Sequence, residues 1–335
     1  MLGGRATLSV IRWKCSNPSV ELRRHLQMTA CRQRAQLIDG KKIAGEIYEE
    51  LTAEVKHIVS CGQRAPHLVL VRVGGDPASG SYVRNKTKAA DKIGIQSTVH
   101  HLPGDTSQST ILSLVNQLNI DPDVDGILVQ LPLPDHMEEK LICNSVIPEK
   151  DVDGFHIINI GRFCLDMRSM APCTSLGVME LIKRYGIETF GKNAVVCGRS
   201  KNVGMPLAML LHGDGIRPDG ETGGMDATTT ICHRYTPMDQ LQKFTAIADI
   251  IVTATGLPGL INGNMIKPGC AILDVGINRI KDPITGKPRL VGDCDFESCA
   301  EKASYITPVP GGVGPMTVAM LMRNTVWAAK KIVTY

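Results

Sequence analysis

Short apolar runs that end in glycine or proline recur along this chain and alternate with segments of helical periodicity. LVLVRVG at 68–74 and GILVQLPLP at 126–134 are typical of buried strands that run into turns. At 41–60 the apolar residues are spaced three and four apart, which predicts an amphipathic helix, and 78–93 and 108–119 suit further helices. With a short strand predicted at 97–101, the resulting βαβαβ alternation predicts an α/β fold, with a parallel sheet covered by helices.

A second βα series follows the loop-rich stretch PEKDVDGFH at 148–156, which we interpret as a domain boundary. We predict strands at 192–200, 228–233, 248–256, 270–278 and at the start of 304–315, and helices at 203–213 and 316–332. The 335 residues are enough for about two domains. No window holds 18 consecutive apolar residues, so stable membrane insertion is not expected.

The net charge of +4 is the sum of two unlike parts. Residues 1–34 hold seven Arg or Lys residues and one acid, which leaves −2 for residues 35–335. An Arg-rich, acid-poor start with scattered apolar residues predicts a mitochondrial transit peptide over 1–35. A disordered basic tail and a nucleic-acid-binding arm are the alternatives; the acidic remainder argues against a nucleic-acid partner. The 11 cysteines lack C-x₂-C spacing, which favours small buried side chains in a reducing compartment.

The loop GRSKNVGMP, after the strand at 192–200, suits an anionic ligand. Gly198 and Gly204 allow the backbone to approach a phosphate, and a helix N-terminus follows. The spacing departs from G-x-G-x-x-G, so by itself it also fits a simple βα turn. The next strand ends in His233 and Arg234, where an acid would favour NAD and a cation favours a 2′-phosphate. Arg199 and Arg234 could therefore converge on one anion.

Four further motifs could carry a substrate site. Tyr82 and Lys86 are four residues apart on one predicted helix face, where a lysine with apolar neighbours can transfer protons. Gln130 stands at the end of a predicted strand, where open α/β sheets bind ligands. KDVDG at 150–154 brings two carboxylates into one loop, and PVPGGVGPMT at 308–317 exposes bare backbone. Each motif alone also fits ordinary packing or turn formation.

Together, SYVRNK, VDGILVQLPLP, PEKDVDGFH, GRSKNVGMP and PVPGGVGPMT resemble the methylenetetrahydrofolate dehydrogenase/methenyltetrahydrofolate cyclohydrolase family over about residues 36–332. The resemblance implies an N-terminal α/β folate domain over 36–155 and a Rossmann-like nucleotide-binding domain over 156–312, with a cleft between them. A C-terminal helix over 313–335 would return to the first domain. It also implies a homodimer formed through the nucleotide-binding domains.

The resemblance implies roles for the substrate-side residues. The family oxidises 5,10-methylenetetrahydrofolate with NAD or NADP and hydrolyses the methenyl product to 10-formyltetrahydrofolate. Lys86 matches the catalytic lysine of the hydrolytic step, and Gln130 matches the residue that tunes it through a hydrogen bond. Tyr82 matches a residue that stacks on the p-aminobenzoyl ring, and Asp153 matches the pterin-binding carboxylate. The loop with Pro310, Gly311 and Gly312 would lie between folate and nicotinamide.

The resemblance also implies a cofactor site and a subtype. The cofactor-binding residues would be Gly198, Arg199, Ser200, Gly204, His233, Arg234 and Thr317. Most members of the family have serine at the position of Arg234. The mitochondrial bifunctional enzymes have arginine there, so the chain resembles that subtype or a paralogue of it. In that subtype the two arginines hold inorganic phosphate in the place of the NADP 2′-phosphate. Mg²⁺ positions this phosphate through acids matching Asp166 and Asp226. In this chain an insert at 213–225 precedes Asp226.

Three alternatives stay open on the sequence. The chain could be a strictly NADP-linked member of cytosolic type, a catalytically inactive folate-binding protein, or an unrelated Rossmann dehydrogenase. Intact Lys86, Gln130 and Asp153 argue against an inactive protein. The expected location is mitochondrial, in the matrix or associated with the inner membrane.

Overall fold

The computed structural model describes residues 34–216, 223–281 and 286–335, apart from the side chains of Pro77 and Ala78. Its helices are α2 (Gly40–Ser60), α3 (Pro77–Ile93), α4 (Gln108–Ile120), α5 (Glu139–Ser145), α6 (Ile157–Cys164), α7 (Cys173–Arg184), α8 (Gly204–His212), α9 (Met238–Ile247), α10 (Phe296–Ala300) and α11 (Val313–Ala329). Its strands are β1 (Gln36–Leu37), β2 (His67–Val73), β3 (Gln96–Leu102), β4 (Gly126–Val129), β5 (Asn193–Cys197), β6 (Thr228–Cys232), β7 (Ile250–Thr253), β8 (Ala271–Asp274), β9 (Asn278–Lys281), β10 (Pro288–Val291) and β11 (Tyr305–Ile306).

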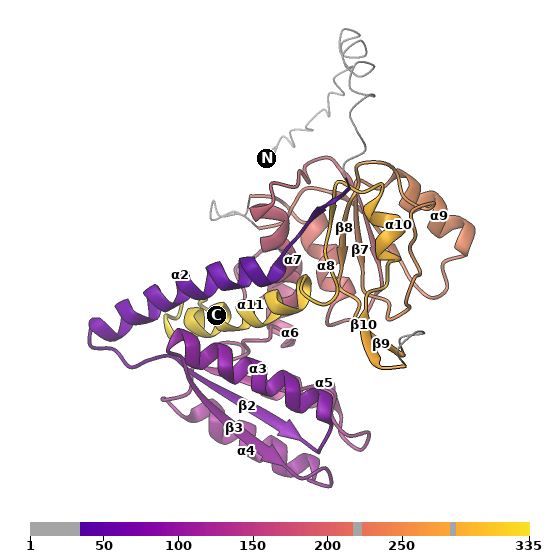
Figure 1. Cartoon of the computed structure of the whole chain (residues 1–335). Coiled ribbons are helices and arrows are strands. Elements are labelled where there is room, and N and C mark those ends of the chain that lie inside the picture. Colours follow the sequence, from indigo (N-terminus) through magenta and orange to yellow (C-terminus); the bar gives the residue numbers. More distant parts are fainter. Residues whose placement is uncertain (1–33, 217–222, 282–285) are drawn as a thin grey trace, which may run out of the picture. The chain divides into compact units, whose positions relative to one another are not determined.

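The smaller sheet has the order β3-β2-β4, with all neighbours parallel (Figure 1). Successive side chains of β2 point to opposite faces, as a strand period of two requires. Leu68 and Leu70 pack into a core with apolar residues of α2 and α3, whereas Val69 and Val71 pack with those of α4. Burial on both faces explains why this strand is continuously apolar. The βαβαβ pattern predicted from the sequence is confirmed here.

The larger sheet has the order β1-β11-β8-β7-β5-β6, and its strands are also parallel. Its first strand, β1, belongs to a different domain from the one inferred from the sequence. Gln36 and Leu37 pair with Tyr305 and Ile306 of β11, so this segment joins the nucleotide-side sheet before the chain enters α2. The fold therefore places residues 36–37 outside the folate domain to which the sequence assigned them. The antiparallel hairpin of β9 and β10 was not predicted either.

The predicted transit peptide lies almost entirely outside the described residues. Its last two residues, Arg34 and Ala35, belong to the fold: Arg34 forms an ion pair with Glu297, and the Ala35 N–H donates to the Ala300 carbonyl at 2.8 Å. Ala35 is also buried. A cleavage that preserves these contacts would fall before residue 34, slightly earlier than the sequence boundary. Among the described helices, none is long and apolar enough to cross a membrane.

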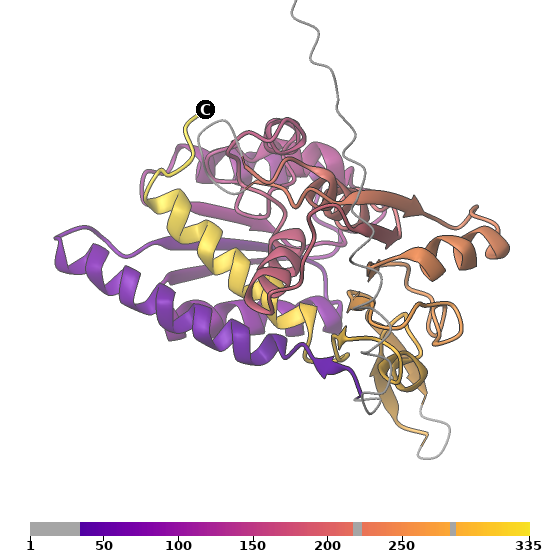
Figure 2. The same ribbon diagram turned by 90° about the horizontal axis from the view of Figure 1, so that it is seen from above.

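Helix α11 lies beside α2 and α7, and it also contacts α3, β2 and β4 (Figures 1 and 2). The fully buried residues of α11 include Met316, Ala319, Met320 and Met322. Helix α7, which the sequence analysis missed, is buried over most of its circumference.

The start of α2 allows a direct test of how closely it packs on the Pro-Gly-Gly loop. A Cβ on Gly40 would lie 1.8 Å from the Gly312 carbonyl oxygen, whereas a Cβ on Gly45 of the same helix would meet nothing within 4 Å. We expect Gly40→Ala to lower the free energy of unfolding by about 1–3 kcal/mol, the usual cost of overpacking. Gly45→Ala should raise it by roughly 0.5–1 kcal/mol. Equal effects of the two variants in urea unfolding would contradict this packing.

Candidate active site

The side chains of Lys86 and Gln130 meet where α3 passes the carboxyl end of β4. The Lys86 Nζ donates a hydrogen bond of 2.9 Å to the Gln130 Oε1. The Gln130 Nε2 donates to the Leu131 carbonyl at 2.7 Å, which directs the amide oxygen toward the lysine. Lys86 is only 9% exposed. The hydrogen bond implied by the family resemblance is therefore present, and it holds one buried amine in a defined position.

Burial also changes the protonation of this lysine. Burial lowers the pKa of Lys86, while the neighbouring Asp153 and Cys173 act in the opposite direction. Burial raises the pKa of Asp153, and Lys86 acts against that rise. A lysine whose pKa is lowered is a neutral amine in more molecules at neutral pH, so it can accept a proton. The lysine and the carboxylate thus form one electrostatically coupled pair.

The loop that carries Asp153 is held from within by Asp151. The Asp151 carboxylate accepts hydrogen bonds from the N–H groups of Gly154 at 3.1 Å and His156 at 2.7 Å. It also accepts one from the Asn159 Nδ2 at 2.9 Å. Burial raises the pKa of Asp151 to about 6, although these donors favour the ionised form. Of the two acids in KDVDG, one therefore organises the loop and the other faces the lysine.

Gly154 makes the turn after Asp153 possible. Its φ is +75°, in the left-handed region that favours glycine. A Cβ at this position would lie 2.5 Å from the Ala171 carbonyl carbon. The segments around residues 153 and 171 are therefore in backbone contact, although they are far apart in the sequence.

Tyr82 lies one helical turn before Lys86, as the i, i+4 spacing predicts. In contrast to the buried lysine, Tyr82 is 44% exposed. An exposed ring beside a buried amine suits a flat ligand that stacks on the tyrosine while its reactive atoms reach the lysine.

The Pro-Gly-Gly loop is attached to the first turn of α2. The Gly311 carbonyl accepts a hydrogen bond from the Lys41 N–H at 3.1 Å, and the Gly312 N–H donates to the Pro308 carbonyl at 2.8 Å. Gly311 has a φ of +115°. The Pro310–Gly312 backbone is thus shaped by contacts that a side chain would obstruct.

Thr317, in the first turns of α11, lies at the start of α7. Its hydroxyl is 3.3 Å from the Thr174 hydroxyl. Thr174 follows Cys173, which is next to Asp153 and Lys86 in the electrostatic cluster. In the fold, only Thr174 and Cys173 separate the predicted cofactor residue Thr317 from the predicted substrate residues Asp153 and Lys86.

On the nucleotide side, Gly198 and Gly204 lie against each other. Gly198 has a φ of +126°, and a Cβ on it would lie 2.3 Å from the Ala254 carbonyl oxygen. A Cβ on Gly204 would lie 2.3 Å from the Gly198 carbonyl oxygen. The Ser200 hydroxyl accepts a hydrogen bond from the Gly204 N–H at 3.2 Å. Both glycines of the unusual G-x₅-G spacing are therefore required by the turn itself.

The predicted arginine pair follows two neighbouring strands. Cys197 pairs with Cys232 in the β5–β6 register, so the chain ends of these strands, with Arg199 and Arg234, leave the sheet side by side. Both arginines are exposed. The Arg199 guanidinium carbon lies 5.7 Å from the centroid of the Tyr235 ring. Two exposed guanidiniums at the carboxyl edge of a parallel sheet could hold one phosphate.

His233 organises the backbone that follows β6. Its Nδ1 accepts a hydrogen bond from the Tyr235 N–H at 3.2 Å, and its own N–H donates to the Thr236 hydroxyl at 3.0 Å. These contacts shape the turn that carries Arg234.

The acids predicted to hold magnesium, Asp166 and Asp226, come together around one turn. The Asp226 N–H donates to the Gly213 carbonyl at 3.1 Å, and its carboxylate accepts from the Gly215 N–H at 3.0 Å. An Asp166 carboxylate oxygen is 2.6 Å from the position of a Cβ on Gly213. Both aspartates have positive φ angles, 53° and 51°. The register of Asp226 predicted from the sequence thus does bring it near Asp166.

Asp226 lies at the amino edge of the sheet, whereas the arginines follow the carboxyl ends of its strands, and the joint magnesium site stays a prediction. Asp226 precedes β6, and its carbonyl accepts a hydrogen bond from the Gly191 N–H just before β5. Arg199 and Arg234 follow the same strands, whose ends are about 13 Å apart at 3.3 Å per residue. Among the described residues, no group of three or more His, Cys, Asp or Glu side chains could hold a metal ion.

One cavity of about 540 Å³ joins segments from both sheets. It is lined by Leu131 and Phe155 from the substrate-side loops and by Lys201 and Asn202 from the loop after β5. Residues of α5, α6 and α8 complete its walls. The loops that carry Gln130, Asp153 and Arg199 thus border a common space.

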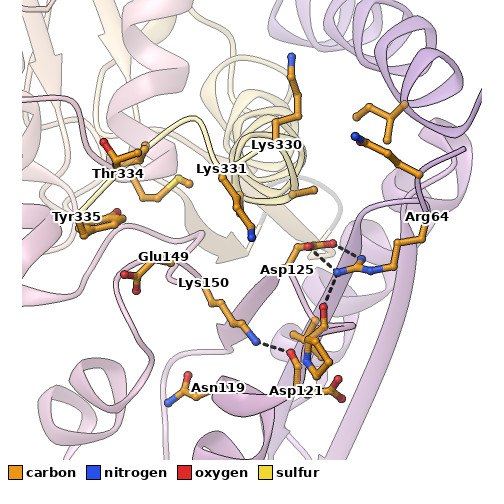
Figure 3. Close-up of a pocket in the computed structure, with 18 of the residues that line it drawn as sticks. Arg64, Asn119, Asp121, Asp125, Glu149, Lys150, Lys330, Lys331, Thr334 and Tyr335 are labelled. Carbon is orange, nitrogen blue, oxygen red and sulfur yellow. Dashed lines mark hydrogen bonds and ion pairs between the residues drawn. The ribbon is translucent and has the colours of Figure 1, made fainter. Parts of the chain in front are cut away.

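A cavity of about 1140 Å³ lies elsewhere, at the amino ends of β2 and β4 (Figure 3). Several of its charged side chains bind other parts of the protein. Arg64 donates to both carboxylate oxygens of Asp125, and the Lys150 Nζ donates to the Asp121 carbonyl at 2.6 Å. None of the predicted site residues lines this cavity, and parallel sheets bind ligands at their carboxyl ends. We therefore place the active site at Lys86 despite the larger volume here.

Sequence reasoning missed three residues that surround Asp153: Asp151 as an organiser, Cys173 and Asn324. Cys173 is buried, and its Sγ is 3.3 Å from the Val152 carbonyl oxygen. Asn324 is fully buried and donates to the same carbonyl at 2.9 Å. One signal was available for Asn324, because an amide within the apolar run AMLMRNTVWAA is unusual and buried polar groups need partners.

Comparison with known proteins matches both parts of the chain. Residues 38–153 match the tetrahydrofolate dehydrogenase/cyclohydrolase catalytic domain, and residues 172–333 match the NAD(P)-binding domain of the same family. A mitochondrial bifunctional methylenetetrahydrofolate dehydrogenase/cyclohydrolase from Gallus gallus is 59% identical over 92% of this chain and 91% of its own length.

Solved structures agree. A 5,10-methylenetetrahydrofolate dehydrogenase from the silkworm Bombyx mori is 53% identical, with a TM-score of 0.83, over 89% of this chain and 99% of that one. A Trypanosoma brucei methylenetetrahydrofolate dehydrogenase-cyclohydrolase, complexed with NADP and an inhibitor, is 38% identical with a TM-score of 0.82. It covers 90% of this chain and 100% of its own.

The coupling between Lys86 and Asp153 can be measured by titration. We expect an NMR titration of the lysine ε-carbon to give a pKa for Lys86 below the ordinary value of a lysine side chain, because burial disfavours the ammonium ion. In Asp153→Asn the pKa should fall further, since the carboxylate that favours the charged amine is gone. An unchanged or higher pKa in this variant would show that the two groups are not coupled.

Proposed function

This chain belongs to the tetrahydrofolate dehydrogenase/cyclohydrolase family, and we propose that it catalyses both reactions of that family. It oxidises 5,10-methylenetetrahydrofolate to the 5,10-methenyl form with a nicotinamide cofactor, and it hydrolyses the methenyl form to 10-formyltetrahydrofolate. The observation that supports both activities in this chain is the buried Lys86 amine, held by Gln130 next to the Asp153 carboxylate. These reactions belong to mitochondrial one-carbon metabolism, as the mitochondrial relative indicates.

We propose that three side chains place the folate. Asp153 accepts hydrogen bonds from the amino and N–H groups of the pterin, and its ionised form is favoured by the adjacent Lys86. The exposed ring of Tyr82 stacks on the p-aminobenzoyl group. The bare backbone of 310–312 lies between the folate and the nicotinamide. When bound, the nicotinamide accepts the hydride that leaves the bridging carbon of the substrate.

In the hydrolytic step Lys86 acts as a proton acceptor and donor. Water adds to the cationic methenyl carbon, and the neutral amine takes the proton that the water loses. The proton then passes to the folate nitrogen whose bond to that carbon breaks, while the hydroxyl of the adduct releases its remaining proton to water and becomes the carbonyl of the formyl group on the other nitrogen. The lowered pKa of Lys86 favours the first transfer, and the Gln130 carbonyl oxygen keeps the amine directed toward the reacting carbon.

Replacing the lysine separates catalysis from binding. We expect Lys86→Met to reduce methenyltetrahydrofolate hydrolysis by at least 100-fold, because general acid–base catalysis contributes about 10²–10⁴. Binding of the methenyl compound, followed by fluorescence or calorimetry, should persist, since Asp153 and Tyr82 remain. Lys88→Met, on the exposed face of the same helix, is the matched control and should hydrolyse normally. Unchanged hydrolysis in Lys86→Met would refute the assignment and favour an inactive folate-binding protein.

The choice of nicotinamide cofactor rests on the exposed arginines at the ends of β5 and β6. We propose that Arg199 and Arg234 bind either the 2′-phosphate of NADP or an inorganic phosphate that accompanies NAD. Gly198, Ser200 and Gly204 form the turn that precedes α8, and the first N–H groups of that helix, those of Gly204 and Met205, are bonded to Ser200 within this turn. His233 shapes the backbone that presents Arg234. A magnesium ion held by Asp166 and Asp226 would help to position this phosphate, as the family resemblance implies.

One assay distinguishes this proposal from a strictly NADP-linked enzyme. We expect inorganic phosphate to increase the rate with NAD severalfold and to compete with NADP, because both anions occupy the arginine pair. In Arg234→Ser the stimulation of the NAD reaction by phosphate should be lost, while hydrolysis of methenyltetrahydrofolate continues. Initial rates over a phosphate series, with and without Mg²⁺, provide the measurement. NAD turnover that does not respond to phosphate would contradict the proposal.

We also propose that the chain forms a homodimer through its nucleotide-binding half. Large apolar side chains are exposed around the turn that holds Asp226, among them Leu165 at 70%, Phe190 at 76% and Ile216 at 75%. Met167, 45% exposed, lines a small cavity together with Gly223 and Gly224 of the same region. Exposed apolar side chains gathered in one region are typical of association surfaces.

The cationic leader supports import into mitochondria, with the enzyme in the matrix or associated with the inner membrane.

A further inference from the structure

Asn324 is a buried amide in the middle of α11, among apolar neighbours. Its side chain is 0% exposed. The Nδ2 donates to the Val152 carbonyl at 2.9 Å and to the Ala171 carbonyl at 3.1 Å, and it lies 3.6 Å from the Cys173 Sγ. All three partners lie outside α11, so this amide forms no hydrogen bond within its own helix. It joins two segments that are separated by almost 20 residues.

These two segments are the ones that carry the substrate carboxylate and the start of α7. Val152 directly precedes Asp153, and Ala171 lies two residues before Cys173. Gly154 lets the backbones approach, because any Cβ there would be 2.5 Å from Ala171. The close approach leaves two buried carbonyl oxygens facing α11, and each needs a donor. Asn324 supplies a donor to both.

The amide oxygen of Asn324 has no such partner. Among the described residues, the Oδ1 is one of the few buried polar side-chain atoms without a hydrogen bond. An unsatisfied buried acceptor costs about 1–3 kcal/mol, so an apolar residue would suit the stability of α11 better. Residues that break a local rule of this kind are expected at functional sites. The amide also donates without carrying a charge, so it leaves the electrostatic balance between Lys86 and Asp153 undisturbed.

We infer that Asn324 is a positioning residue for Asp153, which sets the place of the pterin-binding carboxylate by joining the Val152 and Ala171 carbonyls. The inference rests on the proposed role of Asp153 in folate binding and deepens it. Asp151 holds the loop through the Gly154 and His156 N–H groups, and Asn324 holds it from the opposite side through the Val152 carbonyl. Without the amide, the turn is free to shift relative to Lys86.

The test combines single variants with a double-mutant cycle. Asn324→Leu keeps the number and branching of the side-chain heavy atoms and removes both donors. We expect it to raise the KM for methylenetetrahydrofolate and for methenyltetrahydrofolate about tenfold, a difference of 1.4 kcal/mol in binding. The KM for the nicotinamide cofactor should stay the same, because the nucleotide-side loops are untouched. The matched control is Thr325→Val, one residue further along: Thr325 is also fully buried, but its hydroxyl donates only to the Leu321 carbonyl of its own helix.

The cycle uses Asp153→Asn, whose own folate KM should rise. If Asn324 acts through Asp153, adding Asn324→Leu to Asp153→Asn should change the folate KM by less than twofold, whereas independent effects would multiply. Multiplying effects, or an equal loss in Thr325→Val, would overturn this inference and leave the proposed function intact. An unchanged folate KM in Asp153→Asn would overturn the role of Asp153 as well. Asn324→Ser, which keeps one donor, should give an intermediate KM and serves as the second variant if the leucine chain does not fold.

Discussion

The packing of α11 against α2 and α7 is the constraint on which the active-site geometry depends. The C-terminal helix begins at the Pro-Gly-Gly loop of the nucleotide side and runs along helices that cover the folate side (Figure 2). Its first turns carry Thr317, which meets Thr174 of α7, and its centre carries Asn324, which reaches the loop of Asp153. One rigid helix therefore sets the distance between substrate-side and cofactor-side groups. A hydride transfer needs such a fixed distance, since small misplacements reduce rates strongly.

Within this frame, burial generates the chemistry. A solvent-exposed lysine would be an ammonium ion at neutral pH, but burial lowers the pKa of Lys86 toward the range where the amine can exchange protons. The opposing charge of Asp153 limits this effect, and the lysine in turn favours the ionised carboxylate. The same pair can thus serve both activities: the carboxylate binds the pterin, and the amine handles the proton of the hydrolytic step. Asp151, with a pKa of about 6, keeps the loop organised while it remains ionised.

The two halves of the chain differ in how far local sequence predicted their sites. The strands, the turns and the i, i+4 placement of Tyr82 and Lys86 follow from periodicity, and the structure has them within a few residues of the predicted bounds. The glycines at 198 and 204 follow from the close approach of the loop to its own backbone. The family resemblance also led to Asp166 and Asp226 as partners of the arginines. The parallel register of β5 and β6 puts Asp226 at the amino edge, where its carbonyl accepts a hydrogen bond from Gly191, and the arginines at the carboxyl edge.

The sequence by itself determined the α/β class, most strands of the two parallel sheets, the family and the residues that carry its motifs. These features depend on local periodicity, on the torsion angles that glycine allows and on ordered short motifs. Only the tertiary structure decided that β1 joins the larger sheet, that α7 is buried almost all round, and that Asn324 and Cys173 meet the loop of Asp153. The physical reason is that burial and electrostatic coupling depend on segments brought together by packing. Asn324 lies 172 residues from Val152 in the sequence, yet it donates a hydrogen bond to that residue in the fold.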